Sequence, residues 1–153
     1  GFCSAEQHER FLRQVVPFEA MLAEDGIVLI KLWFSIEREV QAARLVDRER
    51  NPLKRWKLSP VDGQAQEHWE RFTHYKEVVF ARTATPTCPW TVITGNTKKT
   101  ARLESIRYVL SCLDYPATGQ TGLRLTPLPD VVRVLVGPSA APPGEASAER
   151  DAP

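Results

Sequence analysis

The chain has few of the residues that build cross-linked, metal-bound or membrane-embedded proteins. Its 153 residues include only three cysteines and three histidines. The cysteines (Cys3, Cys88 and Cys112) form no CxxC pair and the histidines lack HxxxH spacing, which argues against a disulfide framework or a zinc site. No stretch approaches the roughly 18 apolar residues of a membrane span, and no signal peptide is recognised. We therefore expect a cytoplasmic protein that binds no membrane.

The chain also lacks an excess of charge of either sign. Twenty Lys and Arg residues oppose 19 Asp and Glu residues, so the formal net charge is +1. The chain as a whole is therefore not expected to bind nucleic acid. Methionine is scarce as well, because the sequence begins at Gly1 and its one methionine is Met21. We expect either that a leader has been removed or that this is a piece of a longer chain.

Positive charge is concentrated in one stretch, residues 44–62, which carries six basic residues against three acidic ones. Arg binds phosphate oxygens in a bidentate manner and Lys supplies a point charge, so such a stretch is suited to holding phosphates. The alternative is a solvated helix end followed by a loop, as most charge runs are. The basic residues are Arg44, Arg48, Arg50, Lys54, Arg55 and Lys57.

Hydrophobic periodicity and turn residues predict alternating helices and strands. We expect helices over residues 4–25, 37–50, 59–82 and 98–113, strands over 27–36 and 90–94, a loop over 51–60, and an edge strand within 130–136. Pro17 is expected to kink or divide the first helix. The run 27–36 is apolar at nearly every position, which is typical of a parallel strand buried on both faces. Two such strands cannot cover themselves, so we expect further strands from preceding sequence or from a partner chain.

The same periodicity predicts which side of each helix is buried. The predicted core positions are Phe11, Val15, Phe18 and Leu22 in the first helix, Trp69, Phe72, Tyr75 or Lys76, Val79 and Phe80 in the third, and Leu103, Ile106, Val109, Leu110 and Leu113 in the last.

Several blocks of the sequence resemble the second polyphosphate kinase family. They are residues 1–3 (GFC), 31–36 (KLWFSI), 51–60 (NPLKRWKLSP), 83–85 (TAT), 88–90 (CPW) and 98–103 (KKTARL). The resemblance covers about residues 1–116 and is most specific between Lys54 and Pro60. Two positions depart from the family pattern, since Asn51 and Thr97 stand where acidic residues are usual.

The resemblance implies an α/β fold: a P-loop kinase-like, thymidylate-kinase-like parallel sheet flanked by helices, with a helical lid. It implies that residues 1–116 are the carboxy-terminal part of the kinase domain, with the lid at about 37–83. The remaining residues, 117–153, are expected to be a largely disordered tail rich in Pro, Ala and Gly. The implied activity is phosphoryl transfer between inorganic polyphosphate and a nucleoside mono- or diphosphate, with Mg²⁺.

Four residues are the candidates for this chemistry. Arg44 and Arg48 lie four apart and should share a helix face, from which they would neutralise charge on the transferring phosphoryl group. Lys54 and Lys57 are expected to bind phosphate from the following loop. Asp62 is expected to cap the next helix or to orient one of the bases. Arg50 and Arg55 are expected to be less involved.

The sequence contains no GxxxxGK[ST] phosphate loop. We therefore expect a fragment that is inactive alone, with the magnesium ligands in the absent amino-terminal part. The alternative is a non-catalytic remnant that binds polyphosphate or a partner. A fragment of an ordinary nucleoside monophosphate kinase is a third, weaker interpretation. The acceptor nucleotide, the direction of transfer and homo-oligomer formation stay open.

Overall fold

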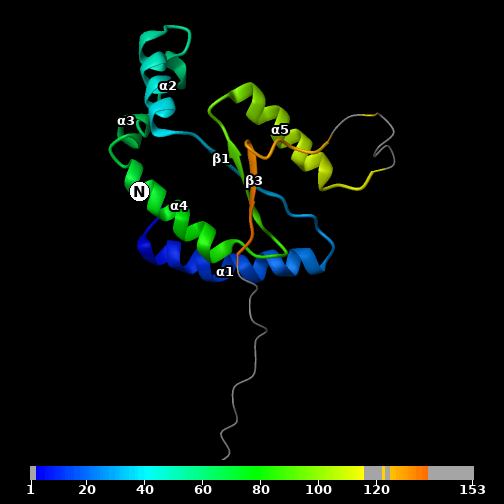
Figure 1. Cartoon of the computed structure of the whole chain (residues 1–153). Coiled ribbons are helices and arrows are strands. Elements are labelled where there is room, and N and C mark those ends of the chain that lie inside the picture. The colour runs from blue at the N-terminus through cyan, green and yellow to red at the C-terminus, as the bar shows by residue number, and fades with distance from the viewer. Residues whose placement is uncertain (1–2, 116–121, 123–124, 138–153) are drawn as a thin grey trace, which may run out of the picture.

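The computed structural model describes residues 3–115, 122 and 125–137, which form an α/β arrangement around a three-stranded sheet (Figure 1). This confirms the predicted fold class. The elements are α1 (Ala5–Glu24), β1 (Lys31–Ser35), α2 (Arg38–Arg50), the 3₁₀ helix η1 (Arg55–Lys57), α3 (Asp62–Ala65), α4 (Trp69–Thr83), β2 (Trp90–Thr94), α5 (Lys98–Ser111) and β3 (Val132–Leu135). Most of the predicted tail lies outside the described residues.

The sheet has the order β1-β2-β3. β1 and β2 are parallel, with Trp33 opposite Val92, and β3 adds to β2 in the antiparallel direction. The strand predicted over residues 90–94 has those bounds in the structure, and the predicted edge strand is confirmed as β3. The sheet is therefore mixed, with a parallel pair, β1 and β2, and an antiparallel edge strand, β3.

α1 and α4 pack against one face of the sheet. Trp33 of β1 and Trp90 of β2 both contact Phe80 of α4, with ring centroids 5.4 and 5.5 Å apart. On the same face Lys31 is buried, and its Nζ donates to Glu19 Oε2 of α1 and to the Thr83 carbonyl of α4, each at 2.7 Å. This buried ion pair therefore joins two helices and the first strand.

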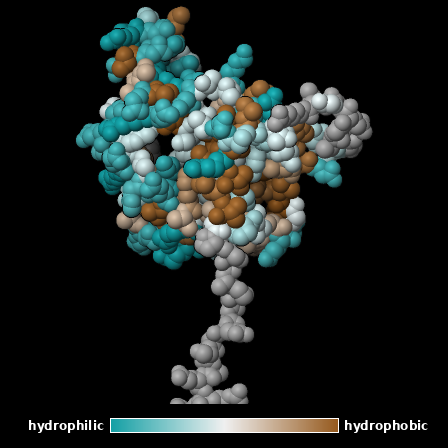
Figure 2. All heavy atoms as spheres, viewed as in Figure 1, coloured by the Kyte–Doolittle hydropathy of each residue, from teal (hydrophilic) through white to brown (hydrophobic). Residues whose placement is uncertain are grey.

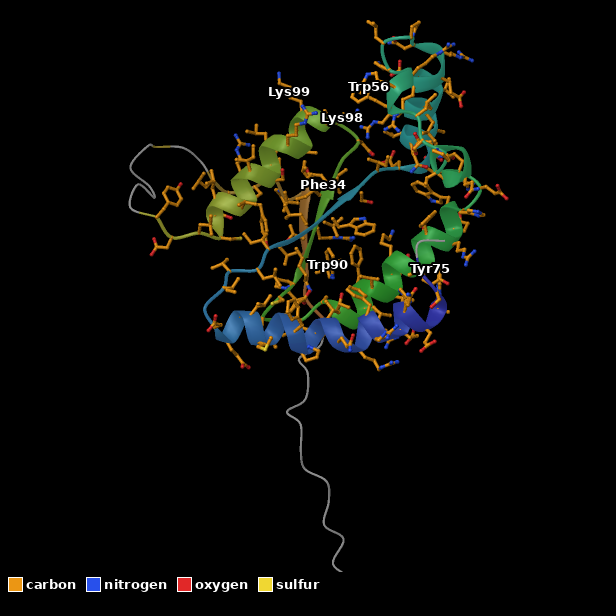
Figure 3. All side chains as sticks on the ribbon, turned by 180° about the vertical axis from the view of Figure 1, so that it is seen from behind. Phe34, Trp56, Tyr75, Trp90, Lys98 and Lys99 are labelled. Carbon is orange, nitrogen blue, oxygen red and sulfur yellow. The ribbon has the colours of Figure 1, made fainter. Side chains whose placement is uncertain are left out.

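α5 covers the other face, over β2 and β3, and the two views place α4 and α5 on opposite sides of the sheet (Figures 1 and 3). Ile93 of β2 is fully buried, and burial raises the pKa of Tyr108 of α5 above its ordinary value. Glu104 is buried as well, and it accepts a 2.8 Å hydrogen bond from the Leu128 backbone N–H. α5 is thereby fixed both to the sheet and to the segment before β3.

The strand predicted over residues 27–36 is shorter in the structure, and its predicted burial on both faces is wrong at Ile27, Val28 and Phe34, which are exposed. Phe34 points to the face covered by α5, but α5 lies over β2 and β3, and 54% of Phe34 is exposed. The edge strand β1 therefore keeps an apolar residue uncovered in this chain.

The predicted buried side of α1 is also wrong. Phe11 and Phe18 are exposed, whereas Leu12 and Glu19 are buried. The buried side is one position further along because Glu19 pairs with Lys31, and a charged partner cannot be recognised from hydrophobic spacing. Pro17 does not divide the helix, which is continuous over 20 residues. Gly26 follows the helix with a φ of 85°.

Predictions for the later helices are also wrong, both in which residues are buried and in where one helix is divided. Leu103, Ile106 and Leu113 are exposed or lie beyond α5, and the buried residues of that helix are Ala101, Glu104 and Ser105. The single helix predicted over residues 59–82 is instead divided into α3 and α4. Phe72 and Tyr75 of α4 are exposed, while Phe80 belongs to the core.

Residues 38–65, comprising α2, η1 and α3, project from this body, and we call them the arm (Figure 1). None of its residues is buried. α2 ends at Arg50, where Asn51 has extended backbone, so the predicted break before Pro52 is confirmed.

Candidate functional site

The candidate site lies where the arm approaches the amino end of α5. The four predicted site residues belong to α2 and to the loop that follows it, and each has a defined contact. These contacts decide which of the positive charges face a common space and which are already neutralised.

Arg44 connects the arm to the core. Its Nη2 donates to the backbone carbonyls of Gly95 and Asn96, both at 2.8 Å. Asn96 in turn accepts a 3.0 Å hydrogen bond at its Oδ1 from the Glu37 backbone N–H, just before α2. Arg44 therefore holds α2 against the turn between β2 and α5.

Gly95 makes this close approach possible. Its backbone N–H donates to the Ser35 carbonyl at 2.6 Å, and a Cβ at this position would lie 3.1 Å from both that carbonyl oxygen and Ile36 Cγ2. A side chain would therefore push the turn away from the end of β1, and the carbonyls that receive Arg44 would move with it.

Arg48, one turn further along α2, is paired with an acid. Its Nη1 lies 2.8 Å from Asp62 Oδ2, which also accepts a 3.3 Å hydrogen bond from the Ser59 backbone N–H. Asp62 is the first residue of α3, and no side chain caps that helix. Of the two roles considered for Asp62, the contacts favour orienting Arg48 over capping.

The two predicted lysines have different surroundings. Lys54 pairs with Asp47 of α2, with a distance of 2.5 Å from Nζ to Oδ2, so its charge is neutralised within the arm. Lys57 lies over the ring of Trp56 at 5.1 Å from the centroid. Arg50 and Arg55 are exposed, as expected for residues outside the site.

Lys98, the first residue of α5, lies close to three of the predicted cations. The positive charge of Arg44 lowers the pKa of Lys98 below its ordinary value, and the charges of Lys57, Arg48 and Arg102 lower it further. All four charged neighbours that act on Lys98 are cations. The structure thus brings Arg44, Arg48 and Lys57 together around Lys98, whereas Lys54 is not among these neighbours.

Sequence reasoning did not include Lys98 among the site residues. A usable signal was nevertheless present, because Lys98 follows a glycine turn at the carboxyl end of a parallel strand. Ligand sites of open α/β sheets lie at that edge. In Figure 3 Lys98 lies at the end of α5 nearest to the arm, which carries the labelled Trp56.

Two hollows lie near the same ends of the strands. One of about 330 Å³ is bordered by β1, the arm and α4, through Trp33, Phe34, Gln41, Trp69, Phe72 and Lys76. Another of about 350 Å³ lies at the carboxyl ends of β1 and β2 and includes Glu37, Thr94 and Asn96. The second hollow includes Asn96 of the turn to which Arg44 is bound.

Among residues 3–115, 122 and 125–137 no group of three or more His, Cys, Asp or Glu side chains is arranged to hold a metal ion. In the same part of the chain no helix is long and apolar enough to cross a membrane.

Comparison with known proteins gives consistent results. The family model described as Polyphosphate kinase 2 (PPK2) matches residues 1–121. The chain is 44% identical over 140 residues to a GDP-polyphosphate phosphotransferase of Pseudomonas aeruginosa, covering 92% of this chain. It is 46% identical over 136 residues to NDP-polyphosphate phosphotransferase 3 of Ruegeria pomeroyi, covering 86% of this chain.

A solved structure shares the fold. The crystal structure of polyphosphate kinase 2 from Arthrobacter aurescens superposes with a TM-score of 0.67 at 26% identity, covering 77% of this chain and 46% of that one. The two curated relatives are matched over only 38% and 45% of their lengths. The chain therefore spans about two fifths of the length of the relatives it matches.

Proposed function

This chain belongs to the polyphosphate kinase 2 family, and we propose that it forms the polyphosphate-binding part of a phosphotransferase. The enzyme would move phosphoryl groups between inorganic polyphosphate and a nucleoside mono- or diphosphate. The names of the relatives support this proposal, because they are GDP- and NDP-polyphosphate phosphotransferases.

The observation that carries the proposal is the gathering of cations around Lys98. Arg44, Arg48 and Lys57 come from the arm and Lys98 from the core, and the charged groups that lower the pKa of Lys98 are all positive. Polyphosphate is a flexible chain of anionic groups, and phosphoryl transfer depends mostly on positioning and on neutralising charge. Such a cluster supplies both.

We assign different tasks to the four predicted residues. Arg48, oriented by Asp62, and Lys57 would contact phosphate oxygens. Arg44 is engaged with two backbone carbonyls, so it would position the arm and contribute its field to the site. Lys54 would add only a weak contribution because Asp47 neutralises it.

The proposed domain organisation follows from the same contacts. Residues 1–116 would be the carboxy-terminal part of the kinase domain, with the arm and α4, at about residues 37–83, acting as its lid. The sequence contains no glycine-rich phosphate loop, and the described residues contain no group of three or more potential metal ligands. Magnesium would therefore be held elsewhere, and this chain would bind polyphosphate without transferring phosphate by itself.

A chimaera tests the proposed activity. The matching segment of the Pseudomonas aeruginosa relative is replaced by this chain, and transfer from polyphosphate to GDP is measured. We expect activity, and we expect Arg48→Ala to lower kcat by about 10²–10³-fold, as for the loss of a donor that stabilises transition-state charge. Arg50→Ala, on the same helix but exposed, is the matched control and should leave kcat unchanged. An unchanged rate in Arg48→Ala would remove Arg48 from the site.

The alternative is a polyphosphate-binding protein without catalysis, and the missing phosphate loop is the observation that favours it. A folded chimaera that binds polyphosphate but transfers nothing would support this alternative. Transfer by the 153-residue chain alone would contradict the proposal that it needs residues from elsewhere.

A further inference from the structure

We propose that Lys98 is a phosphate-binding residue on the core side of the site, opposite Arg48 and Lys57 of the arm. The inference rests on the proposed function, because it names a further contact for the same polyphosphate. It assigns a binding role to α5, to which neither the sequence patterns nor the matched names gave one.

The backbone geometry brings α5 and the arm together. Arg44 of α2 is bound to the carbonyls of Gly95 and Asn96, and α5 begins two residues later at Lys98. The second link, from the Glu37 backbone N–H to Asn96 Oδ1, fixes the start of α2 to the same turn. Lys98 is therefore held at a defined place relative to α2, even though it belongs to another layer of the molecule.

The charges around Lys98 indicate an anion. Arg48 is paired with Asp62 and Arg44 donates to carbonyls, whereas no acidic side chain among the described residues forms an ion pair with Lys98. Its pKa is lowered first by the charge of Arg44 and then by three further cations. Placing like charges together is unfavourable, and a polyanion bound between them would remove that cost.

The next residue provides a matched control. Lys99 has the same side chain and follows Lys98 on α5, but successive residues of an α-helix point about 100° apart. Both lysines are exposed, and in Figure 3 their side chains leave the helix in different directions. A difference between the two alanine variants therefore reports position and not net charge.

Binding of inorganic tripolyphosphate to the 153-residue chain, measured by calorimetry at fixed ionic strength, tests the inference. We expect Lys98→Ala to raise Kd by about tenfold or more, as for the loss of a hydrogen bond to a charged group. Lys98→Arg should keep most of the affinity, and Lys99→Ala should change Kd by less than about twofold, because it removes an exposed charge only.

The outcomes separate this inference from the proposed function. Binding that is weakened by Lys57→Ala but not by Lys98→Ala would overturn the role of Lys98 and leave the proposed function standing. Equal losses in Lys98→Ala and Lys99→Ala would also overturn it, because they would show a response to net charge alone. Absence of binding by the unaltered chain would reject both proposals.

A second measurement uses the unaltered chain, so it does not require that any variant folds correctly. The pKa of the Lys98 ammonium group is followed by NMR in the unaltered chain, with and without tripolyphosphate. We expect a value below the ordinary value of lysine in the free protein, and a rise when tripolyphosphate binds, because a nearby anion favours the protonated form. An unchanged pKa of Lys98 on saturation would overturn the inference.

Discussion

The sheet with α1 and α4 is held by burial, whereas the arm is held by polar contacts at the surface. In the first region the Lys31–Glu19 pair and the Trp33–Phe80–Trp90 cluster lie inside the fold. In the second, no residue between 38 and 65 is buried. Figure 2 agrees, since the arm surface is mostly hydrophilic while apolar residues gather over the body.

This difference determines which region can move. Segments with few buried apolar contacts open at a lower free energy than the core does, and mobile elements of binding sites are drawn from such segments. The arm is attached to the Gly95–Asn96 turn before α5 through Arg44, and to α4 through Arg38, whose Nη1 lies 3.5 Å from Glu70 Oε1. The polar contacts fix the position of the arm, and because they are few, the arm can separate from the core at a low free energy.

The largest effect is expected in the buried pair. Lys31→Met should leave the carboxylate of Glu19 buried without its partner, and the Thr83 carbonyl would lose its donor. Breaking such a pair typically costs about 3–5 kcal/mol of unfolding free energy. Urea denaturation followed by circular dichroism measures this loss.

The matched control is the double variant Glu19→Leu with Lys31→Met. Replacing both charges by apolar groups removes the unpaired carboxylate, so most of the lost stability should return. If the double variant were as unstable as the single one, packing and not charge would explain the loss.

A smaller and local effect is expected at the attachment of the arm. Arg44→Ala removes two hydrogen bonds that one part-buried guanidinium nitrogen donates to backbone carbonyls, and we expect the two together to contribute about 1.5–3 kcal/mol. The free energy of opening α2 should fall by an amount of this order, because few other contacts hold the arm. Hydrogen exchange should quicken in α2 and stay unchanged in β2.

Arg50→Ala is the control for this variant, because Arg50 lies on the same helix but is exposed. It should leave the exchange rates of α2 nearly unchanged. Faster exchange throughout β2 in Arg44→Ala would show that the arm and the core open together, which would contradict the contrast between them.

The strands and the arm helix could be predicted from sequence, but the buried sides of α1 and α5 could not. Strand β2 lies between Pro89 and Gly95, and helix α2 ends just before Asn51. These residues are local signals in the sequence. The buried positions Glu19 and Glu104 are polar, and their partners come from distant segments. Hydrophobic spacing assigns such residues to the surface, so it selected the wrong side of each helix.

The candidate site divides in the same way. The density of basic residues indicated Arg44, Arg48 and Lys57 because they lie within one stretch of the chain. Lys98 lies 41 residues after Lys57 in the sequence, and the contacts of the Gly95 turn with Ser35 and Arg44 bring the two to the same place. The predicted Lys54 belongs to the stretch, but its pairing with Asp47 depends on how the loop after α2 folds back.

The smallest effect is expected for that pair, which lies at the surface of the arm. Both side chains are close to half exposed, so water and salt screen their attraction. Asp47→Asn should lower the unfolding free energy by only about 0.2–1 kcal/mol, the usual range for exposed pairs. A double-mutant cycle with Lys54→Met, measured by urea denaturation at low and high salt, isolates the interaction between the two charges. A coupling energy larger than that of the Lys31–Glu19 pair would contradict this comparison, since the arm would then contain a stronger electrostatic contact than the core.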